Sequence, residues 1–262
     1  MTVCELLGVS VTPAARLGIY FSRFRPRAEE NREGWGIAWW HDGHAEVRKE
    51  ARPAHESDLA ARMADEHPAS EVFIVHVRAA TVGALTEANA HPWDATALGR
   101  EWVFAHNGTI EHLERLDVGS FAQTGETDSE RAFHHVLTRL AARVDPTDDE
   151  IAAEILAAGR ELSERDSRVN FLLSDGTTLY VYHDGHRTLH VLEKHAADLG
   201  EIGMGDDDYQ VSLRLGDAPD ERAVIVASVP LTDEPGWQRL AAGSFLVVRG
   251  GRVVVRETQP VR

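Results

Sequence analysis

The chain has 262 residues, 43% of them hydrophobic, and a formal net charge of −16 at pH 7. A chain of this length can bury a sizeable core, and we expect one domain over residues 1–262. The acidic surplus argues against nucleic acid and membrane surfaces as partners, because both attract a basic face. No apolar run reaches the length of a membrane span and no secretory signal is present, so we expect a cytoplasmic protein.

Lysine and cysteine are both rare in this chain. Lys49 and Lys194 are its only lysines, against 43 acidic residues. We interpret this balance as that of a salt-rich cytoplasm, in which salt screens the repulsion between carboxylates. GC-rich codon usage would explain the missing lysine but not the acidic excess. Cys4 is the single cysteine, so no internal disulfide and no cysteine-based zinc site can form.

Hydrophobic patterning predicts a mixture of strands and helices. The predicted strands cover residues 4–9, 36–40, 45–49, 72–78, 102–106, 169–174, 178–182, 188–192, 223–228, 245–249 and 252–256. The predicted helices cover residues 13–24, 57–66, 129–143 and 148–165. Thr147 and Glu150 have the spacing of a capping box at the start of the last helix. Helices in pairs between groups of strands favour an α+β fold in which helices pack on antiparallel sheets.

Two Asp-Gly pairs, at residues 42–43 and 184–185, predict β-hairpins. Both turns are flanked by histidines, namely His41, His44, His183 and His186. We interpret these histidines as polar residues at hairpin tips, and we expect no metal site. The sequence contains neither a GxGxxG nor a Walker-type glycine loop, so no cofactor is expected.

Four stretches place polar groups beside glycine or at the ends of strands. They are Cys4 with its neighbours, HVRAAT at 76–81, AHNGTI at 105–110 and GETDSE at 125–130. Asn107 and Gly108 end an apolar run, where a side-chain amide and a backbone N–H can form an oxyanion hole. A plain Asn-Gly turn is the alternative, and His106 beside it is interpreted as a packing residue.

Arg78 and Asp128 are the charged candidates in these stretches. Arg78 ends a buried run, and its planar guanidinium suits a carboxylate, although a surface ion pair is the alternative. Asp128 lies at the start of a predicted helix, where an aspartate can serve as the N-cap.

The order of CELLG, GWGIAW, HVRAAT, AHNG and GETDSE resembles the class II glutamine amidotransferases, which are N-terminal-nucleophile hydrolases. NFLLSDG at 170–176 and SVPLTDEPGW at 228–237 resemble the stand-alone members, so the resemblance spans nearly the whole chain. It implies a four-layer αββα sandwich, with two stacked antiparallel sheets flanked by helices. It also implies hydrolysis of a γ-glutamyl amide bond, in glutamine or in a γ-glutamyl peptide or conjugate, through a γ-glutamyl thioester on an N-terminal cysteine.

The resemblance implies a role for each candidate residue. Cys4 is the nucleophile, and its own α-amino group, with an ordinary pKa of about 7.7–8.0, is the base. Asn107 and Gly108 form the oxyanion hole. Arg78 holds the α-carboxylate of the substrate and Asp128 holds its α-ammonium group.

Two further residues, Trp35 and Thr81, are expected at the wall of the substrate pocket. Many members have a tryptophan directly after the arginine, where this chain has Ala79, so the contact of that tryptophan is missing. If ammonia passes to an acceptor, a separate synthase subunit is expected as partner, because the chain has no part that resembles a synthase domain.

The start of the chain departs from the stand-alone members, in which cysteine follows the initiator methionine. Met1, Thr2 and Val3 precede Cys4. The peptide bond between Val3 and Cys4 would make the α-nitrogen of Cys4 an amide, which is not a base at neutral pH. Translation from the codon of Val3, cleavage of a short propeptide, or an intact and inactive tail would each account for this. We favour the first. The third corresponds to the alternative function, a non-catalytic glutamine or γ-glutamyl sensor or regulatory subunit with a blocked N-terminus.

Overall fold

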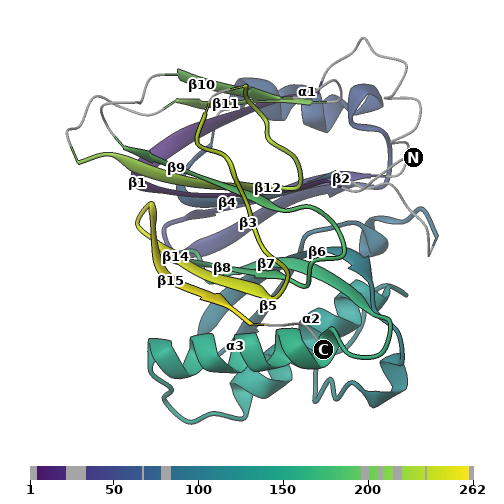
Figure 1. Cartoon of the computed structure of the whole chain (residues 1–262). Coiled ribbons are helices and arrows are strands. Elements are labelled where there is room, and N and C mark those ends of the chain that lie inside the picture. The colour runs from purple at the N-terminus through teal and green to yellow at the C-terminus, as the bar shows by residue number, and fades with distance from the viewer. Residues whose placement is uncertain are drawn as a thin grey trace.

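Two antiparallel sheets lie face to face in the computed structural model of the chain (Figure 1). The structure describes residues 5–21, 34–66, 68–77, 84–195, 201–205, 209–214, 220–233 and 235–259. The first sheet has the order β13-β9-β12-β1-β4-β2-β3, with the β10–β11 hairpin joined to β1. The second sheet has the order β15-β14-β8-β7-β6-β5.

The strands have the following bounds. In the first sheet they are β1 (Glu5–Phe21), β2 (Trp35–His41), β3 (His44–Glu50), β4 (Ala69–Val77), β9 (His190–His195), β10 (Glu201–Gly205), β11 (Tyr209–Arg214), β12 (Arg222–Ala227) and β13 (Gln238–Arg239). In the second sheet they are β5 (Trp93–Ala97), β6 (Arg100–Thr109), β7 (Arg168–Ser174), β8 (Thr178–His183), β14 (Ser244–Arg249) and β15 (Arg252–Thr258).

Helices cover the outer face of each sheet (Figure 1). Helix α1 (Asp58–Glu66) lies on the first sheet, where its Met63 joins an apolar cluster with Val9 and Phe73. Helices α2 (Asp128–Ala141) and α3 (Asp148–Leu162) lie on the second sheet. Short 3-10 turns are η2 (Ala54–Glu56), η3 (Glu87–Asn89) and η4 (Leu113–Arg115).

A third apolar cluster fills the space between the sheets, with Leu6 and Ile74 from the first and Leu172 from the second. The four-layer αββα sandwich is therefore confirmed. None of the described helices is both long and apolar enough to cross a bilayer.

The helix predicted over residues 13–24 is wrong, because residues 5–21 form the long strand β1. Its pairing with β4 shifts register between Ser10 and Ala15, at an irregularity that includes Pro13, whose nitrogen has no hydrogen for a ladder bond. Beyond this irregularity β1 pairs with β11, which lies far away in the sequence. A long-range strand partner therefore overrides the local pattern. Residues 22–24 of this prediction lie outside the described residues.

Of the two predicted hairpins, the one at Asp42-Gly43 is confirmed and the one at Asp184-Gly185 is wrong. The first joins β2 to β3, with His41 opposite His44. The second connects β8 of one sheet to β9 of the other. The carboxylate of Asp184 accepts the N–H of Val169 at 2.5 Å and the N–H of His186 at 2.7 Å. The turn is thus held to the start of β7, and the chain then continues into β9 of the other sheet.

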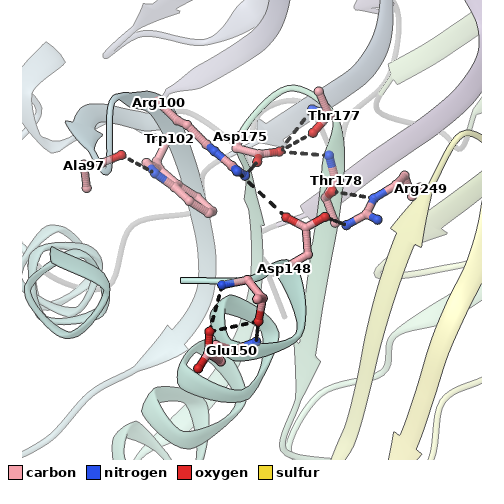
Figure 2. A network of polar contacts seen from close by, with 10 residues as sticks. Ala97, Arg100, Trp102, Asp148, Glu150, Asp175, Thr177, Thr178 and Arg249 are labelled. Atoms are coloured by element: carbon pink, nitrogen blue, oxygen red, sulfur yellow. Dashed lines mark hydrogen bonds and ion pairs between the residues drawn. The ribbon is translucent and has the colours of Figure 1, made fainter. Parts of the chain in front are cut away.

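A charged network at one end of the second sheet holds the start of α3 (Figure 2). Asp148, the first residue of α3, accepts from Nη2 of Arg249 at 2.9 Å and lies 3.8 Å from Nη2 of Arg100. Arg100 also pairs with Asp175 at 2.7 Å, and this hydrogen bond raises the pKa of the guanidinium. The predicted capping box of Thr147 and Glu150 is present beside the network.

We predict that Asp148→Asn lowers the thermal unfolding midpoint more than Asp149→Asn does. Both changes remove a carboxylate from the first turn of α3. The two variants therefore lose a similar interaction with the helix dipole. Only Asp148 contacts the arginines of the sheet, and exposed pairs of this kind contribute about 0.2–1 kcal/mol. Calorimetry of both variants at low and high salt measures the difference, which should shrink as salt rises. Equal midpoints for the two variants at low salt would contradict the role of the network.

Candidate active site

Asn107 and Gly108 lie near the carboxyl end of β6, where the strand has a partner on one side. On that side, Asn107 pairs with Asn170 and Gly108 with Val169 of β7. On the other side, the register of β5 with β6 ends at Phe104 among the described residues. Asn107 is 3% exposed, so its amide is held in the body of the protein rather than at a free turn.

The backbone of Gly108 points toward the edge of β6 that has no strand partner among the described residues. The N–H and the carbonyl of Val169 are both bonded to Asp184, at 2.5 Å and 3.1 Å, and so point away from β6. Val169 and Gly108 are therefore a non-hydrogen-bonded antiparallel pair, in which both residues turn their polar groups outward. The N–H of Gly108 is directed to the side where β5 no longer pairs.

Only glycine fits at position 108. A Cβ atom there would overlap the carbonyl oxygen of Arg168 and would lie 2.8 Å from Nε2 of His106. The close approach of the two backbones thus depends on the missing side chain.

Asp128 is held against the chain that follows Gly108. Its Oδ2 accepts the N–H of Ile110 at 2.6 Å. The N-cap of α2 is Thr127, whose hydroxyl accepts the N–H of Glu130, so the alternative of Asp128 as the N-cap is wrong. The carboxylate of Asp128 instead joins the first turn of α2 to the end of β6.

The loop in front of Asp128 is fixed by two residues that the sequence analysis missed. Glu130 is 1% exposed, and its carboxylate accepts the N–H groups of Thr124 and Gly125 at 2.7 and 2.8 Å. Asn89, in η3, accepts the N–H of Glu126 at 2.8 Å through Oδ1. The Thr-x-x-Glu spacing of Thr127 and Glu130 was an available signal, whereas nothing in the sequence connected Asn89 to this loop.

Three chain segments meet at one end of the first sheet. Val77, at the end of β4, pairs with Glu5 on one side and with Trp35 on the other. Cys4, Arg78 and Thr81 themselves lie outside the described residues. Cys4 is adjacent to Glu5 in the chain and Arg78 is adjacent to Val77, so each is one peptide bond away from this row.

Trp35 is 1% exposed and belongs to the apolar cluster between the first sheet and α1. The structure thus places this side chain in the core, and its predicted part in a pocket wall stays a prediction.

The segment after η3 connects this end of the first sheet to the Asp128 loop. The ring of His76 stacks on His91 with centroids 4.0 Å apart, and Gly36 lies so close to the carbonyl of His91 that a Cβ would overlap it. Nζ of Lys49 donates to the carbonyls of Ala90 and Pro92 at 2.9 and 3.0 Å, and burial lowers the pKa of this amine. Since this segment directly follows Asn89, which binds the loop in front of Asp128, the two sheet ends and that loop are held together.

A pocket of about 310 Å³ lies next to Ile110, which follows the end of β6. It is lined by residues of the segments 110–116 and 161–167, including Ile110, whose N–H binds Asp128. Arg115 and Arg165 lie beside Glu111 and Glu164 in the lining, so the pocket offers both signs of charge to a ligand. In the described part of the chain, no cluster of histidine, cysteine and carboxylate side chains is arranged to hold a metal ion.

Comparison with known proteins identifies relatives over nearly the full length. The family described as class-II glutamine amidotransferases matches residues 3–262. The Escherichia coli protein named "Putative glutamine amidotransferase YafJ" is 30% identical over 260 residues, which cover 96% of this chain and 100% of that protein. The structure titled as a "predicted glutamine amidotransferase" from Pseudomonas aeruginosa has a TM-score of 0.81 and 28% identity, and the match covers 96% of this chain and 100% of that chain.

A further relative has a more specific name. The γ-glutamyl-hercynylcysteine sulfoxide hydrolase of Mycolicibacterium smegmatis is 27% identical over 245 residues, or 91% of this chain and 88% of that protein. With the family match over residues 3–262 and the αββα sandwich, these findings lead to one conclusion. The chain belongs to the class II glutamine amidotransferases.

Proposed function

We propose that the protein hydrolyses the amide bond of a γ-glutamyl group through a thioester on Cys4. The observation that carries this proposal is the arrangement at the end of β6. The N–H of Gly108 points to the edge of β6 that is unpaired in the described part of the chain, and two residues further on the N–H of Ile110 donates to the carboxylate of Asp128. A donor for a developing oxyanion and a partner for an ammonium group are thus connected by a short piece of backbone.

The proposed reaction begins with transfer of the Cys4 thiol proton to the α-amino group of the same residue. The thiolate attacks the γ-carbonyl carbon, and the oxyanion accepts hydrogen bonds from the side-chain amide of Asn107 and the N–H of Gly108. The C–N bond breaks, and the leaving amine takes the proton from the α-ammonium group of Cys4. The α-amino group of Cys4 then deprotonates a water molecule, which attacks the thioester. This step releases the γ-carboxylate and returns the proton to the Cys4 thiolate.

The head group of the substrate has two charges to be recognised. In this proposal Arg78 binds the α-carboxylate and Asp128 the α-ammonium, with Thr81 and Trp35 at the pocket wall. These contacts select a γ-glutamyl group whose α-amino and α-carboxyl groups are both unblocked. If the released ammonia is used, a separate synthase subunit receives it.

One observation favours a γ-glutamyl conjugate as substrate beside glutamine. The Mycolicibacterium smegmatis relative is named as a hydrolase of such a conjugate. Glutamate release from glutamine and from γ-glutamyl-cysteine, measured side by side, distinguishes the two substrates.

We predict that the protein purified from its native host begins at Cys4 and takes up one molecule of a glutamine-mimicking diazo-ketone. The adduct forms on the Cys4 thiol, which the free α-amine deprotonates, so Cys4→Ala, which has no thiol, should give no adduct. Intact mass before and after treatment measures both points. A mass that retains Thr2 and Val3, with no adduct, would contradict the hydrolase and support a γ-glutamyl sensor.

We predict that Asn107→Ala lowers kcat by about 10²–10³ and changes KM little, because an oxyanion-hole donor acts in the transition state. Steady-state kinetics with glutamine measure the split. Thermal unfolding of the same variant is the control for folding, since Asn107 is buried. A rise in KM with unchanged kcat would instead make Asn107 a contact of the bound substrate.

A further inference from the structure

His106 connects β6 to the first turn of α2 through a hydrogen bond that the proposed reaction does not use. The ring is 1% exposed. Its Nε2 lies 3.2 Å from the carbonyl oxygen of Arg168, and its Nδ1 lies 2.8 Å from Oγ of Ser129. Since a carbonyl only accepts hydrogen bonds, Nε2 carries the hydrogen. Burial lowers the pKa of His106 and favours the neutral ring, in which Nδ1 is the acceptor.

The hydroxyl of Ser129 has one hydrogen and two acceptors within reach. Nδ1 of His106 is 2.8 Å away and Oδ1 of Asp128 is 3.4 Å away. The shorter contact takes the hydrogen, because a hydrogen bond weakens steeply with distance. Oδ2 of Asp128 accepts from Ile110 at 2.6 Å, so Oδ1 keeps its capacity to accept from a ligand.

We infer that His106 and Ser129 are positioning residues, which keep the Ser129 hydrogen away from Asp128 and so leave Oδ1 to the α-ammonium of a γ-glutamyl ligand. The inference rests on the proposed function for the identity of the ligand. Neither residue touches the substrate in this scheme, and both act through Asp128. His106 also packs directly under Gly108, so one ring supports both proposed binding elements.

Protonation of His106 would reverse the arrangement. Nδ1 would then donate to Ser129, whose own hydrogen would turn to Asp128 and compete with the ammonium group. Asp128 and Asp184 favour the protonated ring, whereas burial and Arg187 oppose it. Because the pKa of His106 is lowered, the neutral ring persists below the ordinary value of about 6.5, and binding should weaken only at more acidic pH.

The decisive test is the rescue of one change by a second. His106→Gln places an amide near the position of Nε2 and removes the acceptor at Nδ1, so the Ser129 hydroxyl turns to Asp128. We expect Kd for L-glutamate to rise about tenfold, the effect of impairing one charged hydrogen bond. In His106→Gln/Ser129→Ala the competing hydrogen is absent, and Kd should fall back toward that of the unchanged protein. His106→Asn keeps an acceptor near the position of Nδ1 and is the matched control. Its Kd for L-glutamate should rise less than that of His106→Gln.

Glutarate, which lacks the α-amino group, separates positioning from packing. Calorimetric Kd values for glutarate should change by less than about twofold in His106→Gln, because the lost contact is to the ammonium group. The inference would be overturned if His106→Gln raised Kd equally for glutarate and L-glutamate. It would also be overturned if the double variant bound L-glutamate as weakly as His106→Gln does. Since these are binding measurements, they remain informative if glutamine turnover, the test of the proposed function, fails.

A second measurement does not depend on folding of the His106 variants. In the otherwise unchanged protein, Kd for L-glutamate should rise as pH falls below the lowered pKa of His106. In Ser129→Ala, Kd for L-glutamate should not show this rise at low pH, because no hydroxyl remains to turn to Asp128. An identical pH dependence in both proteins would contradict the role of Ser129.

Discussion

The hydrogen bond from the N–H of Ile110 to the carboxylate of Asp128 is the contact on which the candidate site depends. It joins the end of β6, in the sheet, to the first turn of α2, in the helix layer. His106 and Ser129 also join these two elements, but this bond holds the carboxylate itself to the backbone that follows Gly108. The bond is possible because Thr127 supplies the N-cap and leaves Asp128 free for another donor. A local choice at a helix start thus sets the geometry between two layers.

The sandwich brings the first sheet to the same place through the segment 89–93. Lys49 and Gly36, on neighbouring strands, contact this segment by hydrogen bonds and by close backbone approach. Asn89, within the segment, then binds the loop in front of Asp128. The row of Glu5, Val77 and Trp35 is therefore coupled to the second sheet, and an N-terminal nucleophile would need such coupling to meet an oxyanion hole on the other sheet.

Elements with strong local signals could be predicted from the sequence, whereas those that depend on distant partners could not. The capping box of Thr147 and Glu150 marked the start of α3 correctly, because capping is chemistry within one turn. The prediction of a helix over residues 13–24 was wrong, since β11, which is distant in the sequence, pairs with this segment as a strand. The hairpin predicted at 184–185 was wrong for a related reason, because the carboxylate of Asp184 binds the start of β7 instead of closing a hairpin.

The same distinction applies to the site. Although their roles stay predictions, Asn107, Gly108 and Asp128 were predicted as site residues from motifs of a few consecutive residues. Asn89 was not, because its one relevant bond crosses to residue 126 and leaves no local pattern. His106 lay inside a recognised motif but was interpreted as packing, since its partners Ser129 and the Arg168 carbonyl come from other elements.

Lys49 shows how the site constrains a composition that otherwise avoids lysine. The chain has two lysines, yet one of them stands where a cation must donate to two carbonyls, of Ala90 and Pro92, beside the ring of Trp93. An ammonium group is a compact donor that can serve two acceptors on one short segment, while a guanidinium is a wide planar fork. We expect the longer and wider head group of an arginine at this position to displace the segment from β3, and with it Asn89 and the loop in front of Asp128. Lys49 therefore ties the segment 89–93 to β3 and, through Asn89, supports the loop in front of Asp128.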